Sequence, residues 1–311
     1  MGGLQNVTNC STNPCTLVFV ATEQDMLYAF DSSSNSSTPV WSRDLAAAVG
    51  GTAVSCSLFP NWPLCLNKPS GQHIVGPTIG VTGTPVIDTS ASPKTLYVAE
   101  AADVSGTIRY YLLAVDITTG NVLGTGIQIA GSVPGLAPSK CGTSSPLTGQ
   151  TIKFDNNHIQ RSGLLLLNGK VYVAFAAGPG DEVENGWLFA YSFTSNTFSQ
   201  TAAFSTTPDG TGGGIWMSGA GPASDGNSIF VTTGNGTFDL NGSSPLDDDA
   251  GDSLLKLTPA LVRSDYYTPS DVFSYNNNQG RCVNDIDFGS GGVLLPTNFT
   301  YTGSNGGCSS G

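Results

Sequence analysis

A Ser-Gly or Thr-Gly pair that opens a short apolar run occurs four times in this 311-residue chain. The pairs are Thr82-Gly83, Ser162-Gly163, Ser218-Gly219 and Ser290-Gly291, so successive copies lie 80, 56 and 72 residues apart. The same order of turns and apolar runs recurs between copies. A repeat of this length indicates a fold in which one supersecondary unit is used several times.

Each copy is followed by short runs of β-branched and aromatic residues, which clusters of Gly, Asn, Asp and Pro separate. Such a pattern is typical of β-hairpins. The expected strands after the pairs are 95–101, 110–116 and 121–130, then 170–177, 187–193 and 197–204, then 227–234 and 253–258. A partial copy near the N-terminus has expected strands at 17–22, 26–31 and 38–43.

A repeated unit of four antiparallel strands predicts an all-β protein, and specifically a β-propeller of four-stranded antiparallel blades. No stretch keeps a 3.6-residue period, so we expect few helices. A β-sandwich and a parallel β-helix have a similar strand density and stay open as alternatives. The expected blades of this single domain, 1–311, cover residues 1–70, 71–140, 150–210 and 211–275, with the next beginning at 285–311.

About four blades are therefore expected, and we favour their being part of a larger propeller. The C-terminal residues after 296 resemble the opening of another loop. The alternative is a closed four-bladed ring, in which 291–296 supplies the innermost strand beside 17–22. Closure of that kind would remove exposed sheet edges.

The charge balance bears on the class of partner. The chain has 11 Lys and Arg against 23 Asp and Glu, and its net charge is −12. A nucleic acid is a poor partner for such a surface, because both carry negative charge. Hydrophobic residues make up 39%, which is enough for a packed core.

Seven Cys residues indicate an oxidising compartment. Cys10–Cys15 and Cys56–Cys65 are close in sequence within loop-like segments, so we expect two local disulfides and a secreted or periplasmic protein. The pairing of Cys141, Cys282 and Cys308 stays open. The sequence has neither a signal-peptide pattern nor an apolar run long enough to span a membrane.

Two segments carry a family resemblance. LYAFD followed by PVWSRDL (27–45) and LLAVDITTGNVLG (112–124) resemble the repeat of pyrroloquinoline-quinone-like (PQQ-like) propellers. The Trp that ends this repeat is Trp41 in the first segment and is replaced in the second. A resemblance to uncharacterised secreted bacterial propeller proteins covers nearly the whole chain.

The resemblance implies a fold more firmly than an activity. Quinoprotein dehydrogenases of the wider superfamily hold their quinone with Ca²⁺ at the propeller axis, often under a disulfide between adjacent Cys residues. This chain has no adjacent Cys pair. We therefore do not expect a bound quinone, and Ca²⁺ is the cofactor that stays open.

Many acidic residues are expected on one face of the propeller. In a four-stranded blade, the loop between the second and third strands shares a face with the loop leading into the first. The acids assigned to that face are Glu23, Asp25, Glu100, Asp103, Asp155, Asp181, Glu182, Glu184, Asp239, Asp247, Asp248, Asp249, Asp252, Asp285 and Asp287.

The densest group lies in PLDDDAGD (245–252), and its candidate metal ligands are Asp247, Asp248, Asp249 and Asp252. Carboxylate oxygens suit Ca²⁺. The spacing is not that of an EF-hand. Three interpretations stay open: solvated loops that keep the protein soluble, a structural Ca²⁺, or a functional metal.

The residues just before each pair are expected near the propeller axis. There, an aromatic side chain could stack on a polar ring ligand, and charged and hydrogen-bonding side chains could bind its polar groups. The candidate ligand-binding residues are His158, Gln160, Arg161, Trp216, Asp285 and Asp287. Simple packing around the axis is the alternative.

We find no legible catalytic set in the sequence, so the catalytic residues are unknown. The favoured function is a non-catalytic module that binds a protein, a carbohydrate or a cation through its acidic face. A quinone- and calcium-dependent dehydrogenase is the first alternative. A polysaccharide hydrolase using Asp285 and Asp287 is the second, and it requires a suitable separation of the two carboxyl groups.

Overall fold

The computed structural model describes residues 1–59, 65, 76–135, 151–176, 185–240, 242, 248–269 and 288–295. Over these residues the protein is built from antiparallel β-sheets. One helix is present in this part of the chain, the short α1 (Leu45–Ala48), which Asp44 caps through its side chain. The expectation of an all-β protein with few helices is confirmed for the described residues.

The first sheet contains β1 (Leu17–Ala21), β2 (Met26–Asp31) and β3 (Trp41–Asp44), in that order. These strands match the partial copy expected near the N-terminus. The sheet has three strands, and its inward residues, such as Leu17 and Leu27, are fully buried.

The second sheet is built on a long hairpin of β7 (Thr95–Val104) and β8 (Thr107–Asp116). It has six strands rather than the expected four. The other four are β4 (Thr52–Ser55), β5 (Thr78–Ile79), β6 (Val86–Asp88) and β9 (Ile127–Gln128). The fourth strand expected over 121–130 is reduced to β9, since Gly124 just before it has a φ of 70° that strands do not use.

The third and fourth sheets have four strands each, in chain order. The third contains β12 (Leu165–Leu167), β13 (Lys170–Phe175), β14 (Trp187–Thr194) and β15 (Thr197–Ser205). The fourth contains β16 (Ala223–Ser224), β17 (Ile229–Thr232), β18 (Leu254–Leu257) and β19 (Arg263–Tyr267). A separate pair joins β10 (Ser132–Pro134) to β11 (Thr151–Lys153).

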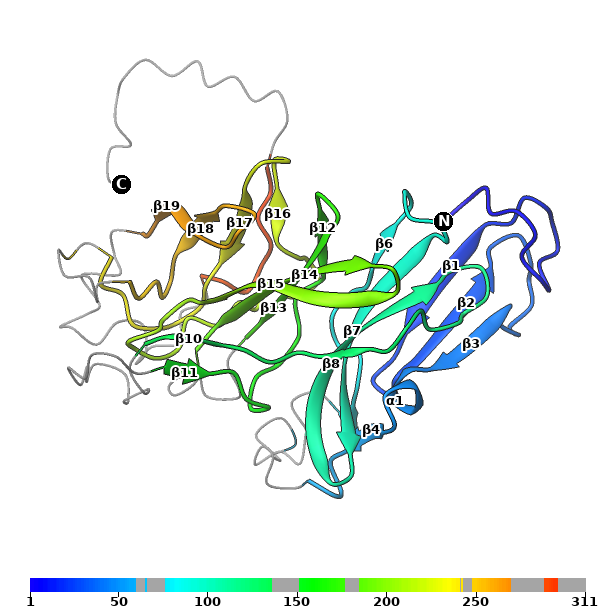
Figure 1. Ribbon diagram of the computed structural model, residues 1–311, viewed down its shortest axis with the longest axis horizontal. Coiled ribbons are helices and arrows are strands. Elements are labelled where there is room, and N and C mark those ends of the chain that lie inside the picture. Colours follow the sequence, from blue (N-terminus) through cyan, green and yellow to red (C-terminus); the bar gives the residue numbers. More distant parts are fainter. Residues whose placement is uncertain are drawn as a thin grey trace, which may run out of the picture.

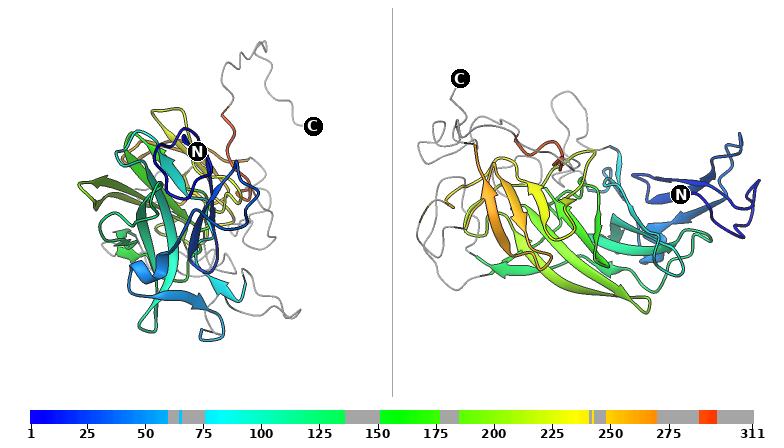
Figure 2. Two further views of the ribbon diagram at one scale, coloured as in Figure 1. Left: turned by 90° about the vertical axis from the view of Figure 1, so that its right-hand side faces the viewer. Right: turned by 90° about the horizontal axis from the view of Figure 1, so that it is seen from above.

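The four sheets follow one another along the long axis of the molecule in chain order (Figures 1 and 2). Successive side chains of a strand point to opposite faces of its sheet. In β7, Leu96 and Val98 pack toward the first sheet, whereas Tyr97 and Ala99 pack toward the third. Alternation therefore gives the second sheet two buried faces.

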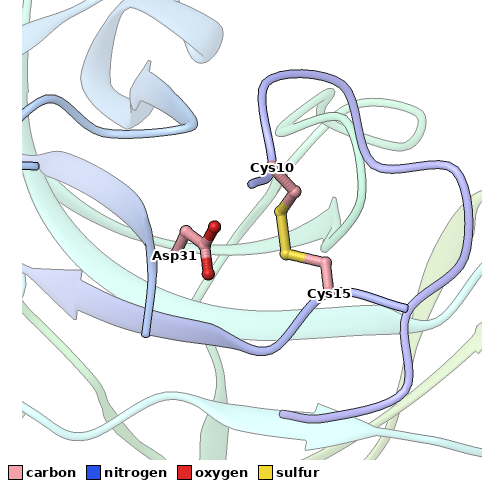
Figure 3. A group of neighbouring side chains, drawn as sticks. All are labelled: Cys10, Cys15 and Asp31. Carbon is pink, nitrogen blue, oxygen red and sulfur yellow. A yellow bond between two sulfur atoms is a disulfide. The ribbon is translucent and has the colours of Figure 1, made fainter. Parts of the chain in front are cut away.

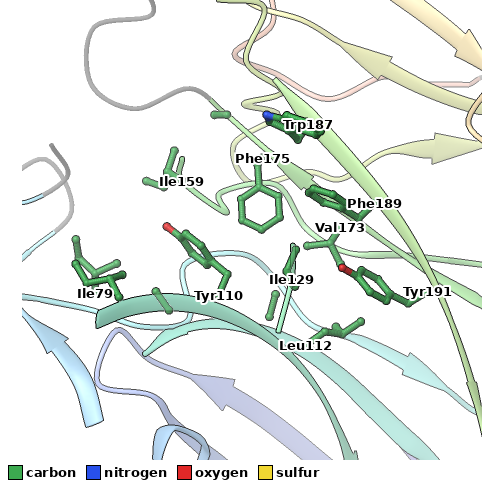
Figure 4. Close-up of a cluster of buried hydrophobic side chains, with 14 of the residues drawn as sticks. Ile79, Tyr110, Leu112, Ile129, Ile159, Val173, Phe175, Trp187, Phe189 and Tyr191 are labelled. Carbon is green, nitrogen blue, oxygen red and sulfur yellow. The ribbon is translucent and has the colours of Figure 1, made fainter. Parts of the chain in front are cut away.

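The third sheet is buried on both faces in the same way. Val173 and Phe175 meet the second sheet in an aromatic core that includes Tyr110 and Phe189 (Figure 4). Tyr172 and Ala174 contact the fourth sheet in another core. Three hydrophobic cores thus join four sheets.

The outward face of the first sheet is partly apolar. Val18 is 50% exposed and Val20 is 42% exposed, and both point away from the core that the first sheet shares with the second. Tyr28 and Phe30 stack on the same face, with their ring centroids 6.0 Å apart. This face has the composition of the faces that the inner sheets bury.

The Ser/Thr-Gly pairs meet one another between the sheets. The Leu164 N–H donates to the Thr84 carbonyl oxygen at 2.9 Å, and the Gly163 N–H donates to that of Ala220 at 2.5 Å. The Ser218 N–H donates to the Ser290 carbonyl oxygen at 3.0 Å. The four pairs therefore form a continuous seam of backbone contacts, which we call the glycine seam.

The seam predicts that Gly83 tolerates no side chain. A Cβ at Gly83 would collide with the Gln160 side chain and approach the Ser162 carbonyl oxygen to 2.5 Å. We expect Gly83→Ala to lower the free energy of unfolding by about 1–3 kcal/mol, as overpacking does. Urea denaturation measures this change.

The matched control is Gly291→Ala, since a Cβ at Gly291 meets nothing within 4 Å. Its effect should stay within about 0.5 kcal/mol. Equal effects of the two substitutions would mean that the seam is not closely packed in solution.

Candidate functional site

Two disulfides are present as expected, Cys10–Cys15 and Cys56–Cys65. Asp31 lies beside the first of them (Figure 3). This is the one trio of metal-ligating side chains among the described residues whose ligand atoms all lie within 4.8 Å of one another. The sulfur atoms are bonded to each other, and Asp31 accepts hydrogen bonds from Ser11. The trio is therefore structural.

Acidic side chains gather at two other places, and the first lies between the first and second sheets. Asp25, in the turn between β1 and β2, and Glu100, on β7, are both 0% exposed. Their carboxyl groups lie within hydrogen-bonding reach of each other. No other donor among the described residues reaches their four oxygens. We call these two residues the carboxyl pair.

Glu23 lies beside the carboxyl pair and faces the glycine seam. Its Oε2 accepts hydrogen bonds from the Gly80 N–H at 2.9 Å and from the Thr82 hydroxyl at 3.1 Å. Burial raises the pKa of Glu23, although these bonds and the nearby charge of Arg161 act to lower it. Glu23 thus connects the carboxyl pair to the first Thr-Gly pair.

The second place is where residues 237–239 and 248–250, which lie between β17 and β18, meet a buried loop of residues 206–214. Asp249 Oδ1 accepts hydrogen bonds from the N–H groups of Asp209 and Gly210, each at 3.0 Å. Asp239 Oδ1 accepts from the Asp249 N–H at 2.8 Å. We call Asp209, Asp239, Asp248 and Asp249 the aspartate cluster.

Negative charges in the aspartate cluster act on one another. Burial, followed by the charge of Asp239, raises the pKa of Asp249 to about 8. Burial, followed by the charges of Asp209 and Asp239, raises the pKa of Asp248 to about 7. Arg263 opposes this effect on Asp248 and donates to its carbonyl oxygen at 3.0 Å. The cluster therefore favours the arrival of positive charge.

His158 is enclosed rather than open to a ligand. It is 2% exposed, and its Nδ1 lies 3.1 Å from Asp155 Oδ1. Its ring lies 4.8 Å from that of Phe154, measured between centroids. The Tyr110 hydroxyl donates to the His158 carbonyl oxygen at 2.5 Å. Burial acts to raise the pKa of Asp155, but hydrogen bonds from His158 and Asn157 leave it lowered.

The other expected ligand-binding residues are dispersed. Gln160 is buried and donates to the Ser162 carbonyl oxygen at 2.5 Å, so it supports the glycine seam. Trp216 is half-buried against the core between the second and third sheets. Arg161 is exposed, and within the described ranges no hydrogen bond, ion pair or cation–π contact joins it to His158 or Trp216.

The acidic residues expected on one face are placed unevenly. Asp25, Glu100, Asp249 and Asp252 are buried, and Glu100 and Asp103 lie within β7 rather than in the loop that follows it. These four acids are not exposed to solvent, so they do not fit the interpretation in which the acidic loops are solvated. Six expected residues lie outside the described part of the chain: Asp181, Glu182, Glu184, Asp247, Asp285 and Asp287.

Sequence reasoning missed two features of these sites. Asp209 joins the aspartate cluster from 40 residues before Asp249, and no local pattern marks it. The carboxyl pair was also missed as a pair, although Glu100 offered a signal, since it is the one charged residue within the otherwise apolar run 96–102.

Comparisons with known proteins leave the chain without an assigned family. No family model matches it, and neither does any curated protein. In the part of the chain that the structure describes, no helix is long and apolar enough to cross a membrane.

The contacts of Asp249 predict a structural cost for its truncation. Asp249→Ala would leave the buried N–H groups of Asp209 and Gly210 without their acceptor, whereas Asp249→Asn keeps an oxygen there. We expect the Ala variant to lose about 1–3 kcal/mol of unfolding free energy at neutral pH, and the Asn variant to lose less.

Urea denaturation without added metal ions measures both variants. Asp265→Ala, on the exposed strand β19, is the control and should change stability by no more than about 0.5 kcal/mol. Equal losses in the Ala and Asn variants would show that the two hydrogen bonds are not formed.

Proposed function

We propose that the protein is a non-catalytic binding module whose aspartate cluster takes up a hard divalent cation such as Ca²⁺. The observation that carries this proposal is the grouping of four aspartates, Asp209 with Asp239, Asp248 and Asp249, whose negative charges act on one another. Ca²⁺ prefers carboxylate and carbonyl oxygens in a flexible arrangement. Bound there, it would fix residues 237–239 and 248–250 against residues 206–214.

The chemistry of the donor set fits such a cation. The described residues around the cluster supply carboxylates and backbone carbonyl oxygens, and Asp248 Oδ1 is buried without a hydrogen-bond donor among them. No three carboxylate oxygens from different aspartates of the cluster lie within 4.8 Å of one another. Binding of the cation would therefore have to draw the side chains together. We infer a site that closes around its ion.

For the architecture, we propose a β-propeller in which the four sheets are successive blades. The support is their chain order, the burial of both faces of the inner sheets, and the glycine seam that joins equivalent positions. The resemblance to PQQ-like repeats agrees with this proposal. A ring of blades would also cover the apolar outward face of the first sheet.

For the compartment, we propose a secreted or periplasmic protein. The support is the two disulfides, which persist in oxidising compartments. A cation-stabilised loop would suit this setting, where calcium is plentiful enough for weak sites. We propose that this loop forms part of the surface that binds a protein or carbohydrate partner.

The dehydrogenase and hydrolase hypotheses gain no support from the described residues. Among the residues proposed for these reactions, Asp285 and Asp287 lie outside that part of the chain. His158 packs against the rings of Phe154 and Trp187, and within the described residues no ion pair or ring contact joins it to Arg161. We therefore retain the binding module.

The cation proposal predicts a calcium-dependent stability. Calcium at about a hundred times its dissociation constant should raise the melting temperature by about 5 °C, because it binds the folded state. The shift should grow between about pH 6 and about pH 9, since Ca²⁺ binds ionised carboxylates and the pKa values of Asp248 and Asp249 are raised. Differential scanning fluorimetry measures both effects.

The test variant is the double substitution Asp239→Asn with Asp248→Asn, which removes charge and keeps oxygen ligands. It should abolish the calcium shift. Asp265→Asn is the matched control and should keep it. A wild-type shift in the double variant would contradict the proposed site.

A further inference from the structure

The carboxyl pair is the most unusual polar feature of the interior. Asp25 comes from the turn between β1 and β2 and Glu100 from β7, so the pair lies where the first and second sheets share an apolar core. Leu96, Val98 and Ala102 share the Glu100 face of β7 and are buried in this core. Both acids are thus removed from water at a junction between sheets.

Two ionised carboxylates cannot share this place at low cost. Each is desolvated, and like charges at hydrogen-bonding distance repel. One proton converts the repulsion into an O–H···O⁻ hydrogen bond. Burial, and then the neighbouring carboxyl group, raises the pKa of Asp25, and burial raises the pKa of Glu100.

The packing favours a proton over a metal ion in this pair. Gly80 lies so close to Asp25 that a Cβ there would collide with its carboxyl group and come within 2.8 Å of its backbone nitrogen. Calcium needs six to eight oxygen ligands, and among the described residues no third metal-ligating side chain places a ligand atom within 4.8 Å of both carboxyl groups. A proton needs no additional ligand.

We propose that Asp25 and Glu100 form a proton-sharing latch that holds the first sheet against the second and weakens as the pH rises. The latch rests on two buried carboxyl groups from facing sheets that have no other donor among the described residues. It does not depend on the cation site, which lies in another loop. It gives the junction a dependence on pH that an apolar core would lack.

The charged groups around the latch act mostly in one direction. Asp44, at the end of β3, adds negative charge that acts on both members, and Glu23 adds negative charge that acts on Asp25. Arg161 acts on Glu23. Tyr111 is the register partner of Glu100 on β8. The surroundings therefore favour the protonated pair.

The sign of the effect follows from proton binding. In the unfolded chain both acids ionise near pH 4, whereas in the folded protein their pKa values are raised. The stabilisation is thus fully present below about pH 4 and declines as the pH rises toward the folded-state pKa values. For each retained proton, the folding equilibrium constant falls about tenfold per pH unit over that window.

The test compares the full chain with Glu100→Gln, in which an amide N–H replaces the shared proton. Urea denaturation between about pH 5 and about pH 8, with a chelator present, gives the folding equilibrium constants. For each rise of one pH unit, the folding equilibrium constant of the wild type should fall about tenfold more than that of Glu100→Gln. Asp265→Asn should follow the wild type.

Infrared spectroscopy detects the shared proton directly, so it distinguishes a protonated carboxyl pair from two residues that only pack together. At neutral pH the wild type should show the carbonyl stretch of buried protonated carboxylic acids, and Glu100→Gln should lose or shift the part of this band that remains in Asp249→Asn, because Asp249 is the other buried acid with a raised pKa. Asp25→Asn serves as the second variant if Glu100→Gln does not fold.

Three results would overturn the latch. The first is a wild type without the protonated-acid band at neutral pH. The second is an unchanged pH profile in both variants. The third is a calcium-induced stabilisation at about pH 8 that Glu100→Gln abolishes, which would identify the pair as a metal site.

Discussion

The burial of both faces of the inner sheets is the constraint on which the rest of this structure depends. In β7 and β13, side chains of alternate parity enter different hydrophobic cores. Neither strand has a solvent-exposed face on which polar residues would be tolerated. Each inner sheet is therefore held by the two sheets that come before and after it in the chain.

Close stacking also explains why backbone, rather than side chains, fills the junctions. At the glycine seam the pairs approach within hydrogen-bonding distance, and a side chain at Gly83 or Gly163 would meet neighbouring backbone atoms. Glycine is the residue that permits such an approach. The repeated motif thus serves the architecture, and no observation gives it a catalytic role.

The same stacking removes acidic side chains from water. Asp25 and Glu100 are enclosed between two sheets, and Asp249 is enclosed where the loop between β17 and β18 meets residues 206–214. A buried carboxylate is costly unless a hydrogen bond, a proton or a cation compensates it. The protein has few Lys and Arg residues to provide compensation. We therefore propose a proton at the first place and a cation at the second.

Most of the strands were predictable from sequence, because apolar alternation between turn residues is a local signal. The strands β1, β2, β8 and β14 fall where the pattern put them. The short strands β4 and β5 were missed, since two to four residues carry no measurable period. The site was predicted in part: the acidic run near Asp249 is visible in the sequence, but its contact with Asp209 exists through the fold alone.

The most direct test of the account is the location of a bound cation in crystals of the protein soaked with a calcium-like lanthanide. Anomalous scattering then marks the ion without reference to any expected ligand. The account predicts a peak among Asp209, Asp239, Asp248 and Asp249, and none between Asp25 and Glu100. A peak at the carboxyl pair, or the absence of a peak at the aspartate cluster, would contradict it.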